Sequence, residues 1–321
     1  PAHRARSLDS KFKPSLHSDT LPAWCLLLLR FQIAVVYIYG GIAKLTPDWF
    51  RGEPMRIWLN HRSDYPLIGP LLETEAAVAF FTYGGLLFDL LIVPALLWKP
   101  SRKWAFAACL FFHTTNAWFF NIGIFPAAMV AASTLFFAPD WPRKALLLFS
   151  PRNDSPPQPQ PNKLLNPALL TFLLLFATAQ LLIPFRHLLY PGNVHWTEEG
   201  HRFSWHMKLR TKSASVQFTA HDPSTNQTWQ INHNGLLSNA QSDRVGRFPE
   251  MILQFAHYLA ENFRREGHPN IQIFADSHAS LNGREPQLLI DPTIDLAQIK
   301  RSLAPHPWIK PLTHPLPTKK D

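Results

Sequence analysis

The sequence predicts a multi-span α-helical membrane domain followed by a small β-rich α+β extramembrane domain. Residues up to about 190 contain long apolar runs, whereas the remainder is polar and carries alternating charges. Within the apolar part, several stretches approach the roughly 20 residues that a bilayer-spanning helix needs. These stretches lie at about 24–45, 76–98, 103–120, 123–139 and 164–184.

A segment rich in Pro, Gln and Asn interrupts the apolar part and is expected to be an irregular, solvated linker. The predicted organisation is a transmembrane helical domain (1–150), this linker (151–163), a last transmembrane helix (164–190), a non-cytoplasmic β-rich domain (191–300) and a flexible tail (301–321). The chain opens with neither an initiator methionine nor a signal peptide, so we expect it to be a fragment or a processed chain that lacks an upstream part.

The basic loops predict which side of the membrane each part occupies. If all the apolar stretches span, residues 1–23, 98–103 and 140–163 share one side, and these segments hold much of the Lys and Arg. The positive-inside rule makes that side cytoplasmic, so everything after residue 185 is predicted to be non-cytoplasmic. The 46–74 loop, with aromatic residues amid charges, suits an interfacial helix.

The polar C-terminal part predicts a small α+β or β-sandwich-like domain. Residues 203–210 and 215–220 alternate as strands do, and residues 248–266 have helical spacing. A further strand pair, 271–275 and 287–290, brackets Asn282-Gly283, and Asn234-Gly235 predicts a turn.

Composition argues against several classes of function. The net charge of +9 is not gathered into one basic stripe with interleaved aromatic residues, so no nucleic-acid partner is expected. Two cysteines are too few for a disulfide framework. The sequence has no HExxH, CxxC, phosphate-binding glycine loop or Gly-x-Ser-x-Gly elbow. Three histidines lack clear metal-binding spacing, so no metal is expected: His195, His201 and His206.

Ionisable groups at membrane depth are costly and often mark function. Lys44 ends the first apolar stretch. It either extends its amine to the interface as an anchor or is held neutral and acts as a base. His113 and Asn116 share one helix face, where they form either an interhelical hydrogen bond or part of a site. Asp89 is interpreted as structural, because nearby glycines indicate close helix packing.

An ordered series of motifs extends over about residues 20–300. It includes Tyr39-Gly-Gly-Ile-Ala-Lys44-Leu45-x-x-Asp48-Trp49, Phe112-His113-x-x-Asn116, Ile122-Gly123-Ile-Phe125, Phe203-Ser204-Trp205-x-Met207, Ser280-Leu-Asn282-x-Arg284 and Asp291-Pro292-x-x-Asp295, with shorter matches at 52–55, 136–144 and 184–187. The series resembles the vitamin K-dependent γ-glutamyl carboxylases, in particular the bacterial type described as the horizontally transferred transmembrane (HTTM) family. The resemblance also implies a further N-terminal membrane region, with another active-site histidine, that this sequence does not include.

The resemblance implies a chemistry. A lysine, here Lys44, deprotonates a reduced vitamin K-type hydroquinone, and reaction with O2 gives a strong base on the way to the epoxide. That base removes a γ-proton from a glutamyl residue, and CO2 captures the carbanion. Burial of a lysine in a low-dielectric pocket favours the neutral amine that such a step needs. The implied partners are the lipid bilayer, the quinol and a glutamate-containing peptide or protein, with no metal.

The resemblance also assigns supporting residues. His113 and Asn116 match the polar pair near the quinone, while Phe125 and Met129 fall where the quinone ring or its isoprenoid chain is contacted. Ordinary helix packing is the alternative interpretation of these two apolar residues. A last pair, Ser204 and Trp205, matches the glutamyl-substrate segment, in which His206 stands where the family has Asp.

The resulting expectation is an integral multi-pass enzyme, in a bacterial inner membrane, that couples quinol epoxidation to the formation of γ-carboxyglutamate. Two alternatives stay open. One is a quinol epoxidase or redox protein that does not carboxylate peptides. The other is a non-catalytic membrane scaffold or lipid-binding protein in which Lys44 is only an anchor.

Overall fold

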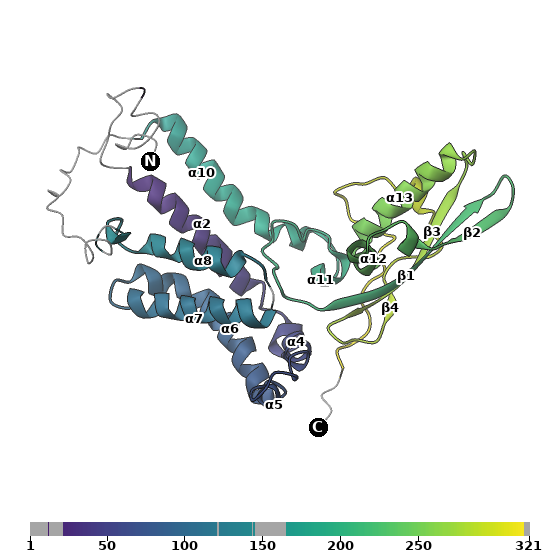
Figure 1. Cartoon of the computed structure of the whole chain (residues 1–321). Coiled ribbons are helices and arrows are strands. Elements are labelled where there is room, and N and C mark those ends of the chain that lie inside the picture. The colour runs from purple at the N-terminus through teal and green to yellow at the C-terminus, as the bar shows by residue number, and fades with distance from the viewer. Residues whose placement is uncertain (1–11, 13–21, 121, 143, 145–164, 318–321) are drawn as a thin grey trace. The chain divides into compact units, whose positions relative to one another are not determined.

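The structure is a computed structural model that describes residues 12, 22–120, 122–142, 144 and 165–317 (Figure 1). The chain divides into two compact units, Pro1–Gly41 with Leu87–Leu181 and Ile42–Leu86 with Leu182–Asp321. The predicted linker, 151–163, lies outside the described residues.

The first unit is helical. It contains α2 (Ala23–Ile42), the second half of α6 (Glu75–Leu97), α7 (Arg102–Phe120), α8 (Phe125–Ser133), the 3-10 helix η2 (Thr134–Phe136) and α10 (Pro167–Leu182). A core of buried side chains, among them Tyr37, Leu96, Cys109 and Phe136, joins α2, α6, α7 and α8–η2. By contrast α10 has no buried residue, although it is apolar all round. Such a helix suits a lipid environment, in which exposed apolar side chains carry no cost.

Three helices of the described residues are long and apolar enough to cross a membrane: Ala23–Ile42, Glu75–Leu97 and Pro167–Leu189. They coincide with the first, second and fifth predicted spans. The third stretch forms α7, which does not qualify, and the fourth forms the shorter helix Phe125–Phe136. That helix is about 18 Å long, less than the hydrocarbon core of a bilayer. The helical membrane domain is therefore confirmed with three candidate spans rather than five.

The 46–74 segment of the second unit does not form the single interfacial helix that the sequence suggested. It folds into three short helices, α3 (Pro47–Phe50), α4 (Met55–Asn60) and α5 (Gly69–Leu72). Gly52 and Leu67 adopt positive φ angles of 79° and 69°, and left-handed backbone ends a right-handed helix. Trp49, Met55 and Leu59 are buried against protein.

Residues 190–317, here called the extramembrane domain, form an antiparallel sheet of strand order β2-β1-β3-β4 (Figure 1). Its elements are η3 (Ile183–Leu189, leading into it), α11 (Val194–Thr197), β1 (Lys212–Asp222), β2 (Gln227–Ile231), η4 (His233–Gly235), α12 (Asn239–Val245), α13 (Pro249–Arg265), β3 (Gln272–Leu281), β4 (Gln287–Leu288) and η5 (Leu296–Gln298). The apolar side of α13 packs Ile252 and Leu259 into one core with Phe218 and Ile273 of the sheet. The predicted β-rich α+β domain is confirmed.

The strand predicted at 203–210 is wrong, because this segment is an irregular loop. Phe203, Trp205 and Lys208 adopt positive φ angles of 62°, 58° and 51°, which a strand cannot accommodate. The alternation reflects a loop that buries Ser204 and His206, half-buries Trp205 between them, and leaves Phe203 and Met207 on either side exposed. The first strand of the sheet begins only at residue 212.

Part of the predicted flexible tail, 301–321, packs on the extramembrane domain. Trp308 is buried in the core, and Ile309 forms an isolated antiparallel bridge with Ile290. The backbone N–H of Lys310 donates to the carbonyl of Leu289 at 2.9 Å. This part of the chain therefore acts as an additional edge segment beside β4.

Candidate active site

Lys44 lies two residues after the end of α2 and is half-buried. Its Nζ is 5.4 Å from the centroid of the Trp49 ring. The ring is itself fixed, because Trp49 is buried and its Nε1–H donates to the carbonyl of Thr82 at 3.0 Å. An aromatic face restrains the lysine side chain and stabilises its cationic form.

The short helix α3 carries this ring. Thr46 caps the helix, with its hydroxyl oxygen accepting the backbone N–H of Trp49 at 3.3 Å, and Pro47 occupies the first helical position. Both features are typical of helix starts, because proline has no N–H to leave unpaired and the cap satisfies one that is free. The cap thus brings Trp49 back over the residues that precede the helix.

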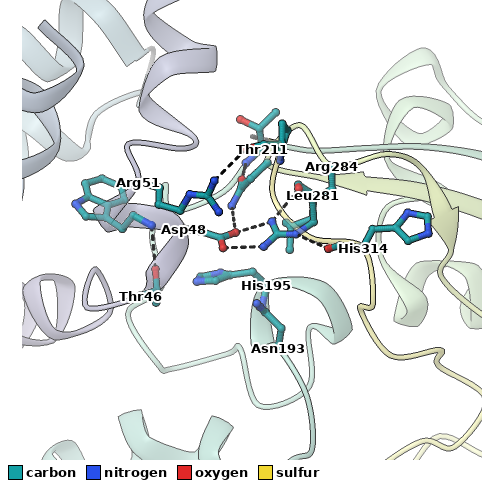
Figure 2. Close-up of polar contacts among 12 residues, drawn as sticks. Thr46, Asp48, Arg51, Asn193, His195, Thr211, Leu281, Arg284 and His314 are labelled. Carbon is teal, nitrogen blue, oxygen red and sulfur yellow. Dashed lines mark hydrogen bonds and ion pairs between the residues drawn. The ribbon is translucent and has the colours of Figure 1, made fainter. Parts of the chain in front are cut away.

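Asp48, which precedes Trp49 in α3, forms a buried ion pair with Arg284 from the turn between β3 and β4 (Figure 2). Nη1 of Arg284 donates to Oδ2 at 2.7 Å, and Nη2 donates to Oδ1 at 2.8 Å. Nδ2 of Asn282 adds a third bond, 2.7 Å, to Oδ2. Both charged residues are 8 % exposed. Such two-pronged pairing of arginine with carboxylate is strong and geometrically specific.

The Asp48 partners are held by the extramembrane domain. Nε of Arg284 donates to the carbonyl of His314 at 3.0 Å, and its Nη1 also donates to that of Leu281 at 3.1 Å. Asn282 exchanges two bonds with the backbone of Thr211, each 2.8 Å long. The sequence motifs contained Asp48 and Arg284, but sequence reasoning gave them no role. Opposite charges in two motifs were the only signal of their pairing.

His113 belongs to the first unit, where it is buried on α7. Its Nε2 shares a 2.7 Å hydrogen bond with the hydroxyl of Tyr37 on α2, so the interhelical bond that the sequence left open exists, with a partner that sequence reasoning missed. The Tyr37 hydroxyl also lies 3.3 Å from Oγ of Ser133. Nδ1 of His113 is buried and has no hydrogen-bond partner among the described residues.

Aromatic rings surround His113. Its ring meets those of Phe88, Phe112 and Phe125 edge-on, with centroids 5.9, 5.3 and 6.4 Å away. Met129 lies in the same core cluster as Tyr37, with Phe125 packed against that cluster. The structure therefore brings His113 and the two predicted apolar residues together. Asn116 is half-buried one turn further along α7 and is not among the hydrogen-bond partners described for His113.

Ser204 and Trp205 lie in the irregular loop of the extramembrane domain. The Ser204 hydroxyl is buried and donates to the carbonyl of His201 at 2.5 Å, so it serves the loop itself. Trp205 is half-buried, and the neighbouring Phe203 is 75 % exposed. Left-handed backbone at non-glycine residues is strained, and such strain gathers at functional segments.

A polar cluster lies beside this loop. Glu198 pairs with Arg210 at 2.5 Å and with Lys212 at 3.6 Å, and Lys212 donates to the carbonyl of Trp196 at 2.6 Å. Burial lowers the pKa of Lys212 to about 7, although the Glu198 carboxylate opposes that shift. The same burial raises the pKa of Glu198.

His206 is buried in this cluster. Its Nδ1 lies 3.4 Å from Nε2 of His195, and its ring also contacts those of His187 and His201. Burial lowers the pKa of His206 to about 3, so the ring is neutral at physiological pH. Nowhere in the described parts of the chain are three or more His, Cys, Asp or Glu side chains placed to hold a metal ion.

Two family models match the chain in sequence order. The HTTM domain matches residues 1–141, and the vitamin K-dependent gamma-carboxylase lumenal domain matches residues 165–315. The chain belongs to the vitamin K-dependent gamma-carboxylase family. The candidate spans and the lumenal-domain match make it a membrane protein with a non-cytoplasmic domain. No solved structure was found to match the chain.

Proposed function

We propose that this protein is a membrane enzyme that couples epoxidation of a vitamin K-type hydroquinone to carboxylation of glutamate side chains. The observation that carries the proposal is the amine of Lys44, held against the Trp49 ring at the end of a candidate membrane span. Membership of the gamma-carboxylase family supports the same reaction class. The co-substrates would be O2 and CO2.

Lys44 would act as the base that takes the hydroquinone proton. A base in an apolar setting has to stabilise the cation that it becomes, since no bulk water solvates the new charge. The Trp49 ring face offers that stabilisation, because its quadrupole attracts an ammonium group. The contact holds the amine at a defined position, as a proton transfer requires, and the family match favours the base over the snorkelling alternative.

The first unit offers groups that fit a hydroquinone. The free Nδ1 of His113 is a buried polar atom suited to a hydrogen bond with a quinone oxygen, and the surrounding rings suit an aromatic ligand. Phe125 and Met129 would contact the ring or its isoprenoid chain, and Asn116 would support the adjacent helix. The reduced cofactor, on reaction with O2, would supply the strong base that removes the glutamyl γ-proton.

The glutamyl partner, a peptide or protein, would bind at the loop that carries Ser204 and Trp205. The strained backbone there projects Phe203 into solvent, while Ser204 keeps the loop in shape. The lumenal-domain match supports a peptide partner on the non-cytoplasmic side. A bacterial inner membrane, crossed several times, is the proposed location.

One observation favours a second candidate, a quinol epoxidase without peptide carboxylation. His206 occupies the position at which the resembled segment has Asp, and its ring is buried among other histidines. A neutral, buried imidazole cannot present the negative charge that a carboxylate would present to a peptide amide or to a cation.

The two candidates separate in one assay. The protein, reconstituted in nanodiscs with any upstream sequence it has, is given reduced vitamin K, O2, 14C-labelled CO2 and a glutamate-rich peptide. Carboxylase function predicts epoxide together with label in the peptide. Epoxide without label supports the quinol epoxidase. Absence of both products contradicts both enzymatic functions and supports the non-catalytic membrane scaffold or lipid-binding protein.

A further inference from the structure

We propose that Arg284 is a positioning residue for Lys44. The ion pair between Arg284 and Asp48 fixes helix α3, and through Trp49 that helix holds the lysine amine. The inference rests on the proposed role of Lys44 as the base. Arg284 itself is expected to touch neither quinol nor peptide.

The stretch of backbone that connects Lys44 to Asp48 is short and has little conformational freedom. Only residues 45–47 separate Lys44 from Asp48, and they form tight turns in which the N–H of Leu45 donates to the carbonyl of Ile42 at 2.9 Å. Pro47 has a fixed φ angle, and the Thr46 cap limits how the segment enters the helix. A shift of Asp48 therefore moves the backbone on which Lys44 and Trp49 lie.

The orientation of α3 is set from outside the helix. The four-residue helix α3 is not stable alone, because fixing its backbone dihedral angles costs more free energy than the hydrogen bonds of one turn contribute. Two side chains anchor it: Trp49 bonds to the carbonyl of Thr82 on α6, and Asp48 bonds to the β3–β4 turn. All hydrogen bonds described for the Asp48 carboxylate come from Asn282 and Arg284.

The site requires the shape of arginine as well as its charge. The guanidinium joins the carboxylate by two parallel bonds, while two more of its N–H groups donate to the carbonyls of His314 and Leu281. Its plane, visible in Figure 2, is thereby tied to the backbone of the extramembrane domain. A lysine could supply one point of charge but could not keep both bonds and the plane.

The arrangement matters to a proton transfer because such steps depend on distance and alignment. A displacement of about 1 Å at a reacting group can cost about 100-fold in rate. Without the two Arg284 bonds, only the single Asn282 bond holds the Asp48 end of α3, so the helix and the backbone that leads back to Lys44 can shift relative to the Trp49 ring. The expected loss is therefore in turnover rather than in quinol binding.

The test compares Arg284→Met and Arg284→Lys with a matched control, Asp222→Asn. Asp222 is buried and pairs with the half-buried His268 at 2.7 Å, at the opposite end of β1 from the Asn282 contact, so the control weakens a partly buried pair of the same domain. Full-length protein in nanodiscs is assayed for kcat and KM with reduced vitamin K. In parallel, mass spectrometry follows acylation of Lys44 by an amine-selective reagent between pH 7 and 10, with Lys310 as the internal reference.

Positioning predicts that Arg284→Met lowers the kcat for epoxide by about 100-fold while the quinol KM changes by less than about threefold. The rate of Lys44 acylation relative to Lys310 changes, Arg284→Lys recovers part of both effects, and Asp222→Asn leaves both as in the wild type. If Arg284→Met does not fold, Arg284→Lys carries the same test.

Unchanged kcat and unchanged Lys44 acylation in folded Arg284 variants would overturn the inference, whatever their stability. A wild-type protein that forms no epoxide would instead reject the proposed function. In that case the acylation profiles still decide whether Arg284 positions the lysine, so the two failures are distinguishable.

Discussion

The carboxylate of Asp48 accepts two hydrogen bonds from the guanidinium of Arg284, 236 residues further along the chain, at 2.7 and 2.8 Å. This pair joins the segment that follows the first membrane helix to the turn between β3 and β4. Four residues before Asp48 lies the lysine on which the proposed chemistry depends. The pair is therefore both a structural link and a constraint on the candidate base.

Removal of one member of this pair should be strongly destabilising. Arg284→Met leaves the buried Asp48 carboxylate without its main partner, and an uncompensated buried charge costs about 3–5 kcal/mol. Thermal unfolding in detergent should show a lowered Tm. The double variant Asp48→Ala/Arg284→Met should recover part of the loss, because no charge is then stranded. Equal stability of the single and double variants would contradict the pairing.

Lys212 should make stability depend on pH. Its pKa is about 7 in the folded protein and returns to its ordinary value near 10.5 on unfolding. Between these values the unfolded chain binds a proton that the folded protein does not, so the free energy of unfolding rises with pH, by roughly 1 kcal/mol per pH unit. Below pH 7 both states are protonated and this contribution is flat.

Denaturant unfolding of wild type and Lys212→Met at several pH values between 6 and 10 tests this prediction. The difference between the two curves should slope between pH 7 and 10 and be level below pH 7. Parallel curves over the whole range would show that Lys212 is not buried as described.

The Tyr37 hydroxyl should stabilise the first unit through His113. Tyr37→Phe deletes the 2.7 Å bond and leaves both nitrogens of a buried imidazole unpaired, which should cost about 1–3 kcal/mol. Ser133→Ala, which loses only the 3.3 Å contact to the same hydroxyl and a bond to its own helix, is the control and should cost less. The Tm values of the two variants in one detergent provide the comparison. The reverse order would contradict the assignment.

A substitution in the irregular loop at 203–210 should affect stability and peptide binding in opposite directions. Phe203→Gly should raise the free energy of unfolding by about 0.5–1 kcal/mol, because glycine adopts a φ of 62° without steric cost. It should also raise the peptide KM if the loop binds the glutamyl partner. Leu67→Gly is a close control, since Leu67 has a φ of 69° and is 99 % exposed. It should stabilise equally and leave peptide kinetics unchanged. A lower stability of both variants would contradict the strain.

Apolar runs and residue spacing in the sequence predicted the long helices. Continuous apolar runs located α2, α6 and α10, and helical spacing located α13 within one residue at each end. The 203–210 segment was misread because burial alternates there without a strand, and no residue type signals a positive φ when the residues are Phe, Trp and Lys. Of the five apolar stretches, two do not qualify as spans, because α7 is not apolar enough and the helix Phe125–Phe136 is too short.

The candidate site was only partly predictable. The resemblance selected His113, Phe125 and Met129, and their rings and side chains do meet in one core cluster or pack against it. The role of Tyr37 as the hydrogen-bond partner of His113 was not predictable, because aromatic residues are common in apolar helices. The pairing of Asp48 with Arg284 depends on tertiary structure, since any of many acidic and basic residues could have been partners by sequence alone.

The most direct test of the central claim is the initial rate of epoxide formation by Lys44→Ala beside Lys103→Ala, in nanodiscs with reduced vitamin K and O2. Lys103 is an exposed lysine at the start of α7, so it controls for the loss of a cationic anchor. If Lys44 is the base, Lys44→Ala forms no epoxide above background, while Lys103→Ala turns over as the wild type does. Epoxide formation by Lys44→Ala at the wild-type rate would contradict the account.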